Sequence, residues 1–433
     1  MKNSLKTNYS KSLVVVAAIF FVAVFYIYSF SPKVSGQEQV PLFSLGETLS
    51  RLTEDEKSSV ASVSESEINF NLTSLSQIDS EQLIFPLPDG KTHVAVRRNT
   101  EGFEERGKDD FTWRGKLKVS GRGSFIWGEK LKGDRLSGDV VLTFKDGSVS
   151  GLIYAGNTVY EIVSKAGRQI LVELDQSKFP DCAGEVKSDE FENETNPVAA
   201  ENDMLAPADT GNTIDVLVLY TSSVRTSLGG STQAQTFAQQ AIDSTNTAYI
   251  NSRISQRVRL VRAQQTTLTE TGSLSTELSN LRNSSTVASL RNQYKADLVA
   301  MISNTGGGCG IGYLMGSASG NQSNAFTVTS RTCVVGNLSF AHELGHNMGS
   351  AHNPENGGGA TYSYGYGHYV NGVFRTVMSY SDPCSSGCTR RAYFSNPSVT
   401  YSGYPTGIAN TRDNARSINN TDVTIANYRS AGN

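Results

Sequence analysis

After residue 212 the chain alternates between apolar runs and amphipathic stretches, a pattern that predicts strands and helices in turn. Thr213–Tyr220 (TIDVLVLY) is a continuous apolar run with the length of a buried strand. The elements expected after it are a helix, a strand, a second helical stretch and a strand, near residues 232–251, 258–263, 274–294 and 297–303. This alternation favours right-handed crossovers and a mainly parallel sheet, which Gly306–Leu314 and Ala325–Ser330 are expected to complete. The predicted fold class of this part is α/β.

The first half of the chain has a different pattern, with short β-type runs between residues 91 and 172. These runs read THVAV, KLKVS, SFIWG, VVLTF, SVSGLIY and TVYEIV. The turn Lys145-Asp146-Gly147, between two of them, has the residue types that a tight β-hairpin requires. We therefore expect a β-rich domain over residues 37–184.

Two further segments lack the pattern of a folded domain. Residues 185–212 hold seven acidic residues up to Asp203, with one lysine and two prolines, and predict an exposed linker that proteases can reach. At the N-terminus, three lysines precede the apolar run Leu13–Tyr28, which is typical of an export signal cleaved before Gln37. The length of this run also suits an uncleaved membrane anchor.

The predicted organisation therefore has four parts. They are a signal peptide or anchor, a β-rich domain, a linker and an α/β domain, over residues 1–36, 37–184, 185–212 and 213–433. Export predicts a secreted, extracellular protein, with a periplasmic or membrane-anchored form as the alternative.

Charge separates the two halves further. Residues 1–212 carry 23 basic against 31 acidic residues, whereas residues 213–433 carry 15 against 10, so the halves should attract each other. Of these 15 cations 14 are arginines, whose guanidinium fork suits carboxylates, although a solvated basic surface explains the bias equally. The net charge of −3 gives no indication of a nucleic-acid partner.

Export also permits disulfides among the five cysteines. Cys309 and Cys333 flank one segment, and Cys384 and Cys388 close the short loop CSSGC, so spacing suggests these two pairs. Spacing alone leaves other pairings open. In the suggested arrangement Cys182 is unpaired, just before the acidic linker.

Three of the chain's five histidines lie in FAHELGHNMGSAH, Phe340–His352. On a helix, His342 and His346 are four residues apart, share one face and can reach the same ion. Gly349 can turn the chain without steric cost, so that His352 returns to that ion. Three neutral ring nitrogens leave one position of a tetrahedral zinc to water, as in catalytic zinc sites.

Glu343 follows the first of these histidines and is expected beside the ion. It can take a proton from the zinc-activated water and deliver it to the leaving amine, which hydrolyses an amide without a covalent intermediate. The separate histidines His93 and His368 are interpreted as structural or exposed. That interpretation does not extend to the full pattern H-E-x-x-H-x-x-G-x-x-H, because five fixed positions rarely coincide by chance.

With the later segment TVMSY, which places Met378 26 residues after His352, this motif resembles the metzincin clan of zinc endopeptidases. The resemblance spans about 220 residues, from Ile214 to the C-terminus. It implies a metzincin-like catalytic domain with a twisted, mainly parallel sheet, an active-site helix and a Met-turn beneath the metal. By the same resemblance Tyr380 is a fifth zinc ligand or an oxyanion-stabilising group, the alternative being a buried core phenol.

Within this clan, four segments are similar to those of the bacterial peptidyl-Asp metalloendopeptidases, which are related to the reprolysins. They are GGGCGIGYL, CVVGNLSFAHELGHNMG, FRTVMSY and YFSNPSVTYSGYPTG. This resemblance implies cleavage on the N-terminal side of acidic residues. The candidates for binding the substrate carboxylate are Arg375 first, then Arg390 and Arg391. The chain departs from the reprolysins at Asn353, where those enzymes usually have aspartate.

The part that precedes the catalytic domain is most simply an inhibitory propeptide. A thiolate from Cys182 can take the fourth zinc position and exclude water, and metzincin precursors often use such a cysteine switch. The alternatives are an inert thiol and simple steric blocking by the β-rich domain.

The sequence thus predicts a secreted zinc endopeptidase made as a zymogen, with one catalytic zinc ion, polypeptide substrates and its own propeptide as inhibitor. We expect a monomer with no nucleic-acid partner and, unless the N-terminal segment stays uncleaved, no stable membrane association. The rival functions are a broad-specificity metzincin and a non-catalytic adhesive or binding protein on the same scaffold. Structural calcium is left open, although no glycine-rich calcium repeat of the serralysin type is apparent.

Overall fold

The structure is a computed structural model of the 433-residue chain, and it describes residues 40–48, 58–71, 81–98, 105–119, 135–187 and 213–429. The predicted export segment, residues 1–36, lies outside the described residues, as does the predicted linker from residue 188 to residue 212. No helix in the described part is long and apolar enough to cross a membrane. From Pro41 onward the described residues belong to one compact unit that contains two large sheets.

The first sheet, here called the N-terminal sheet, is antiparallel. Its strands follow the order β1-β2-β10-β9-β8-β7-β6-β4-β3, with β5 paired to β6. They are β1 (Phe43–Thr48), β2 (Ser62–Phe70), β3 (Gln82–Pro86), β4 (Thr92–Arg97), β5 (Glu105–Gly107), β6 (Asp110–Val119), β7 (Arg135–Lys145), β8 (Ser148–Ala155), β9 (Thr158–Lys165) and β10 (Arg168–Leu174).

The predicted hairpin is confirmed as β7 and β8, which pair in register up to Lys145 and Ser148. Its turn residues Asp146 and Gly147 have φ angles of 47° and 78°, as a two-residue turn between twisted strands requires. The other runs that were predicted as strands lie in β4, β6 and β9, except SFIWG, residues 124–128, which lies outside the described residues.

The second sheet, here called the C-terminal sheet, has the strand order β11-β15-β16-β14-β12-β13. Its strands are β11 (Glu185–Lys187), β12 (Thr213–Tyr220), β13 (Arg257–Gln265), β14 (Leu298–Ser303), β15 (Gly310–Leu314) and β16 (Phe326–Ser330). Only β15 and β16 pair antiparallel among these described strands, and the other neighbouring pairs are parallel. The strands expected after residue 212 are therefore confirmed. The prediction of a linker is wrong for its first three residues, because their backbone groups pair with β15 as β11.

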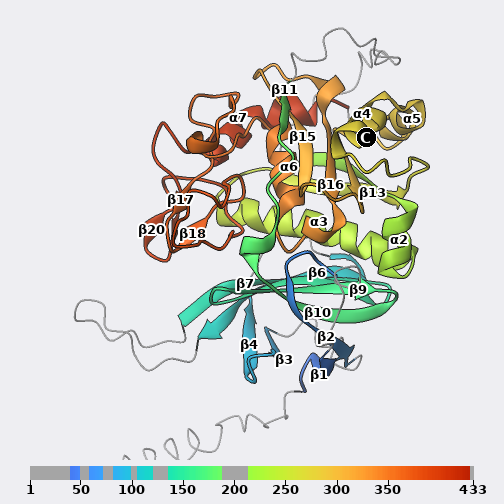
Figure 1. The fold of residues 1–433 in the computed structure, drawn as a ribbon, viewed down its shortest axis with the longest axis vertical. Coiled ribbons are helices and arrows are strands. Elements are labelled where there is room, and N and C mark those ends of the chain that lie inside the picture. The colour runs from blue at the N-terminus through green and yellow to red at the C-terminus, as the bar shows by residue number, and fades with distance from the viewer. Residues whose placement is uncertain are drawn as a thin grey trace, which may run out of the picture. The chain divides into compact units, whose positions relative to one another are not determined.

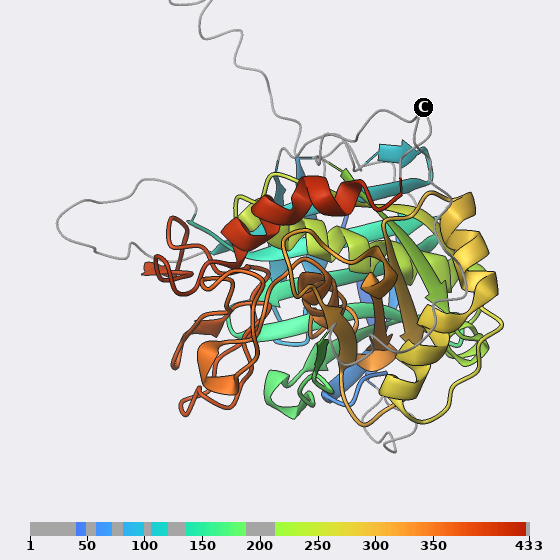
Figure 2. The same ribbon diagram turned by 90° about the horizontal axis from the view of Figure 1, so that it is seen from above.

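The helices cover both faces of the C-terminal sheet (Figures 1 and 2). They are α2 (Ser222–Leu228), α3 (Ser231–Asn251), α4 (Leu274–Asn283), α5 (Ser285–Gln293), α6 (Ser339–Asn347) and α7 (Asn414–Ala426). α4 and α5 pack on one face, whereas α3, α6 and α7 share a core with the other face. The helical stretch predicted near residues 274–294 is interrupted at Ser284, because this extended residue caps a new helix by accepting a hydrogen bond from the Val287 N–H.

Short elements complete the described chain. Two small hairpins pair β17 (Tyr369–Val370) with β18 (Phe374–Arg375) and β19 (Thr400–Tyr401) with β20 (Tyr404–Pro405). Short 3-10 helices are η3 (Gln176–Lys178), η5 (Gln322–Asn324), η6 (Arg331–Cys333) and η7 (Pro354–Asn356).

Helix α3 lies between the two sheets, and Figure 1 shows the N-terminal sheet directly beside it. Its apolar side chains are buried in the core that it shares with the C-terminal sheet, and apolar residues of β8, β9 and β10 enter the same core. Its polar side meets β6 and β7: Asp243 accepts hydrogen bonds from the hydroxyls of Thr112 and Thr143 at 2.5 and 2.6 Å. Arg114 Nε donates to Thr247 Oγ1 at 2.9 Å. The helix therefore meets β6 and β7 largely through polar groups, and β8, β9 and β10 through the shared apolar core.

Replacing Asp243 removes the common acceptor of two buried hydroxyls and the carboxylate 3.6 Å from Arg114. We expect Asp243→Ala to lower the free energy of unfolding of the full chain by about 3–5 kcal/mol, because it leaves a buried charge without its partner. Urea denaturation measures the change. Gln235→Ala, on a partly exposed position of the same helix, is the matched control and should change it by less than about 0.5 kcal/mol. A similar small change for both variants would contradict the prediction.

Candidate metal centre

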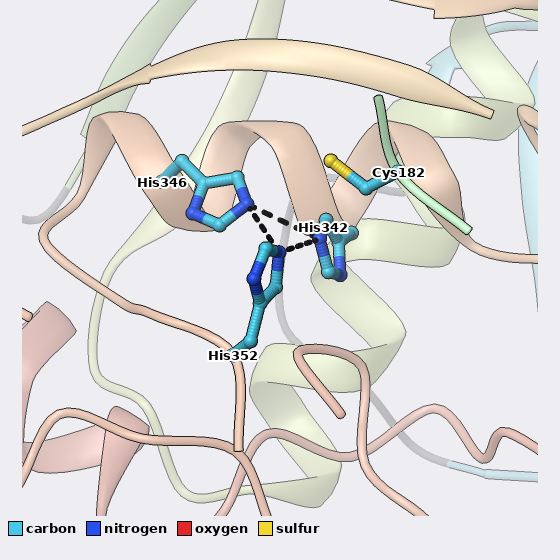
Figure 3. Close-up of side chains that lie close together, drawn as sticks. All are labelled: Cys182, His342, His346 and His352. Atoms are coloured by element: carbon cyan, nitrogen blue, oxygen red, sulfur yellow. Dashed lines mark hydrogen bonds between the residues drawn. The ribbon is translucent and has the colours of Figure 1, made fainter. Parts of the chain in front are cut away.

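Three imidazole rings from α6 and the turn after it meet at one buried point (Figure 3). His342 and His346 lie one helical turn apart on α6. Gly349, with a φ angle of 81°, turns the chain back so that His352 approaches them. The three Nε2 atoms are 3.1, 3.1 and 3.2 Å apart. The structure thus brings together the three histidines that the motif indicates as ligands.

Backbone carbonyls fix the orientation of two of these rings. His342 Nδ1 donates to Val377 O and His346 Nδ1 donates to Ser350 O, each at 2.9 Å. Because a carbonyl oxygen can only accept, Nδ1 carries the proton and the Nε2 lone pair points toward the other rings. A tetrahedral zinc ion with bonds of about 2.0–2.1 Å has ligand nitrogens roughly 3.3 Å apart. The donor type and spacing therefore fit a metal ion.

Burial keeps the three rings neutral at neutral pH. Loss of water contact disfavours the imidazolium form, and this lowers the pKa of His346 to about 4 and the pKa of His352 to about 2. The pKa of His342 is held well below its usual value, first by burial and then by His346. Neutral imidazole is the form that binds a metal cation.

A fourth donor reaches the histidines from residues 175–187, here called the connecting segment. The Sγ of Cys182 and the ring nitrogens all lie within 4.8 Å of one another (Figure 3). Backbone hydrogen bonds on either side of Cys182 tie the segment to Cys309 and Gly310, at the start of β15. The thiol also lies 3.7 Å from Glu343 Oε2. The connecting segment therefore crosses the metal centre with its cysteine turned toward the histidines.

Glu343 is fully buried where α6 meets β15. The glycines of β15 leave room for it, because a Cβ at Gly310 would lie 2.5 Å from Glu343 Oε1 and one at Gly312 would lie 3.4 Å from Oε2. The sequence predicted only a strand from this glycine-rich stretch and missed its role. The available signal was the Gly-x-Gly spacing, which places both glycines on one face of a strand. Together the strand and the helix hold the Glu343 carboxylate beside the convergent nitrogens.

A turn that follows β18 forms the base of the centre. Met378 is fully buried there, and a Cβ at Gly345 of α6 would lie 2.5 Å from its Sδ, so the helix and the turn pack closely only with glycine. The Tyr380 ring centroid lies 4.1 Å from that of His352. Burial raises the pKa of the Tyr380 hydroxyl, and Cys182 and Glu343 raise it further. The structure thus places Tyr380 at the metal centre and outside the apolar core.

Asn353 connects the loop of the third histidine to the same turn. Its Oδ1 accepts from the Tyr380 N–H at 3.0 Å and from Ser379 Oγ at 3.3 Å. Its Nδ2 donates to Glu355 and Asn356 within its own loop. The sequence showed Asn353 only as a departure from the reprolysin pattern, since its partners in the turn are 26 and 27 residues away.

The three predicted carboxylate-binding arginines lie in two different places. Arg375 and Arg390 belong to backbone segments that pair by a parallel bridge, and both side chains are buried beside the turn of Met378. Arg391 instead lies between the rings of Tyr154 and Tyr401, with its guanidinium carbon 5.4 and 5.2 Å from their centroids. Because Tyr154 belongs to β8, Arg391 contacts the N-terminal sheet.

The other histidines and cysteines lie outside the centre. His93 pairs with Asp89 at 3.0 Å on the N-terminal sheet, and His368 is buried elsewhere. The two disulfides suggested by spacing are present, Cys309–Cys333 and Cys384–Cys388, and Cys182 is free.

Comparison with known proteins agrees with this centre. Residues 210–395 match the Reprolysin_5 domain of metallo-peptidase family M12, so the fold and the site define a metallopeptidase. The chain is 30% identical over 386 residues to the peptidyl-Asp metalloendopeptidase of Stenotrophomonas maltophilia (strain R551-3). The aligned region covers 86% of this chain and 87% of that protein. The peptidyl-Asp metalloendopeptidase of Xanthomonas campestris pv. campestris is 30% identical over 409 residues, and the aligned region covers 90% of this chain and 94% of that protein. The chain belongs to this family of metalloendopeptidases, the zinc-dependent enzymes that hydrolyse peptide bonds.

A methyl group at Gly310 should displace the Glu343 carboxylate without touching the histidines. We expect Gly310→Ala to lower kcat/KM of the active enzyme about 100-fold, the usual cost of moving a catalytic group by about 1 Å, while bound metal is retained. A peptide assay and metal analysis of the same preparation measure both effects. Gly306→Ala is the control, since a Cβ there meets no atom within 4 Å. Equal activity of the two variants would show that Glu343 does not depend on this glycine.

Proposed function

We propose that the chain is a secreted zinc endopeptidase made as an inactive precursor. Residues 37–184 inhibit the catalytic domain, residues 213–433, until the chain is cut between residues 188 and 212. The observation that carries this proposal is the position of Cys182. A thiol from the part before the catalytic domain joins three histidine nitrogens at the place where a catalytic site needs water.

His342, His346 and His352 would hold the zinc ion, which supplies a Lewis acid and lowers the pKa of a bound water. Glu343 accepts the proton of the attacking water and passes it to the leaving amine, because its carboxylate is fixed beside the same space. The Tyr380 hydroxyl donates to the carbonyl oxygen of the scissile bond as negative charge develops there. These roles need no serine or cysteine nucleophile.

Inhibition follows from the same geometry. Burial, and then Glu343, raise the pKa of the Cys182 thiol, so that a thiolate at this point requires a strong cation beside it. A zinc ion held by the three histidines would be such a cation, and the Cys182 thiolate would bind it where a catalytic water would otherwise bind. In the precursor, Cys182 therefore replaces the nucleophile.

Part of the contact between the N-terminal sheet and α3 is suited to release. The side of α3 that faces β6 and β7 is polar, with Asp243 and Thr247 bonded to these strands, so water can replace these contacts after release. The excess of acidic residues before residue 213 and of basic residues after it supports docking of the two parts.

Cleavage on the N-terminal side of aspartate and glutamate is the specificity that we propose. The relatives that cover most of this chain are called peptidyl-Asp metalloendopeptidases. Beside the metal centre of this chain, Arg375 and Arg390 offer two buried guanidinium groups, and guanidinium pairs well with a carboxylate. We assign the recognition of the acidic residue to this pair, whereas Arg391 contacts the N-terminal sheet.

A pair of peptides that differ only by Asp→Asn after the scissile bond tests this specificity. We expect kcat/KM on the Asn peptide to be at least about 100-fold lower, because the buried arginines would lose their anionic partner. Fluorescence assays with mapped cut sites measure it, and a chelator should abolish cleavage of both peptides. Equal rates would indicate a broad-specificity protease, and no cleavage of either would indicate a non-catalytic binding protein.

The inhibitory thiol is tested in the uncut chain. Cys182→Ala should raise the peptidase activity of the uncut chain at least about 10-fold over the wild type, or lead to rapid self-cleavage, since water regains the fourth position. Activity and intact mass are followed together. Cys182→Ala should leave the activity of the cut enzyme unchanged, which controls for folding. An uncut variant as silent as the wild type would favour steric blocking by the N-terminal sheet.

A further inference from the structure

The guanidinium groups of Arg375 and Arg390 are buried with neutral partners only. Arg375 donates to Ser379 O at 2.9 Å and to Asn337 Oδ1 at 3.4 Å. Arg390 donates to Asn337 O at 2.9 Å and to Ser379 O at 3.2 Å. In the part of the chain that the structure describes, neither side chain forms an ion pair, and the Nε of each is buried without an acceptor. Buried cations usually have a carboxylate partner, so this pair is prepared for an anion from another segment.

This arginine pair lies against the metal centre. Ser379, which both side chains bind, stands between Met378 and Tyr380, and Asn337 lies two residues before the start of α6. The positive charge of Arg390 also reaches two of the histidines, where it adds to the effect of burial in lowering the pKa of His342 and of His352. An anion bound to the pair would therefore be adjacent to the bond that the metal centre cleaves.

The connecting segment brings a carboxylate to the same place. Asp181 directly precedes Cys182, and its carbonyl accepts from the Cys309 N–H at 3.0 Å, while the Ala183 N–H donates to Gly310 O at 2.7 Å. With the backbone fixed on both sides, the thiol at the histidines and the carboxylate are held one residue apart. The Asp181 side chain is exposed, whereas both guanidinium groups are buried.

Electrostatics connect this carboxylate to the pair. Burial lowers the pKa of the Arg390 guanidinium to about 10, and Asp181 is the strongest of the charges that oppose this effect. Burial and Arg390 hold the pKa of Arg375 well below its usual value, and Asp181 again acts in the opposite direction. The carboxylate of Asp181 thus stabilises the charged form of both arginines.

We propose that Asp181 is a pseudo-substrate residue. In the uncut chain its carboxylate occupies the path to the Arg375–Arg390 pair that the acidic residue of a substrate follows in the cut enzyme. This inference rests on the proposed function, since it requires the pair to recognise acidic substrates. The connecting segment then blocks the enzyme at two adjacent points. Cys182 replaces the attacking water, and Asp181 covers the group that selects the substrate.

The test uses the metal-loaded full chain before cleavage, with Asp181→Asn as the variant. We expect the thiol of Cys182 to react with iodoacetamide about 10-fold faster than in the wild type, and the uncut chain to cleave an Asp peptide about 10-fold faster. Asp181→Glu should remain close to the wild type, because it keeps the carboxylate. Asp175→Asn is the matched control: it changes an acid of the same segment whose side chain only bonds Ser177 nearby.

Salt gives a signature that a loss of folding would not produce. Raising the ionic strength from about 0.05 M to about 0.5 M should increase the alkylation rate of the wild type and leave Asp181→Asn nearly unchanged, because only the wild type has an attraction to screen. If Asp181→Asn keeps its thiol as protected as the wild type while the cut enzyme prefers Asp to Asn peptides, the pseudo-substrate role is wrong and the proposed specificity stands. If the cut enzyme does not distinguish the two peptides, both are wrong.

Discussion

The meeting of three neutral imidazole rings at one buried point is the arrangement on which the rest of the site depends, and the surrounding structure holds their Nε2 atoms 3.1 to 3.2 Å apart. The carbonyls of Val377 and Ser350 prevent two of the rings from turning away. The left-handed turn at Gly349 returns the third ring to the other two. Burial also disfavours protonation of the rings, because it lowers their pKa values. The surrounding structure therefore presents three imidazole rings to one point in the neutral form that binds a metal cation.

The candidate ligands could be brought together from the sequence because their geometry is local. A spacing of four residues on a helix and a glycine seven residues after the first histidine fix the three rings with little help from the rest of the chain. The same holds for the hairpin at Asp146-Gly147 and for β12, since a turn and a continuous apolar run are properties of single segments. Local signals also placed the two disulfides, whose cysteines flank single segments.

The contacts that support those ligands could not be predicted in this way, because each joins segments that are far apart in the sequence. Gly310 makes room for Glu343, and Asn353 holds the backbone of Tyr380. The strand β11 forms only because the edge of β15 offers unpaired backbone groups to a polar segment that would otherwise be a linker. Arg390 and Arg391 are adjacent arginines, and the sequence gives no sign that their surroundings differ. Only the packing of Arg391 against Tyr154 in the folded chain distinguishes them.

The polar side of α3 has a consequence for the processing that we propose. A helix that is packed on both sides usually exposes apolar side chains when one of its neighbours is removed, and such an apolar patch promotes aggregation. On α3, the side that faces β6 and β7 carries Asp243 and Thr247, whose hydrogen bonds to the N-terminal sheet can pass to solvent. In the processed enzyme that we propose, this side of the helix would stay hydrophilic, whereas the core that now includes residues of β8, β9 and β10 would lose that apolar cover.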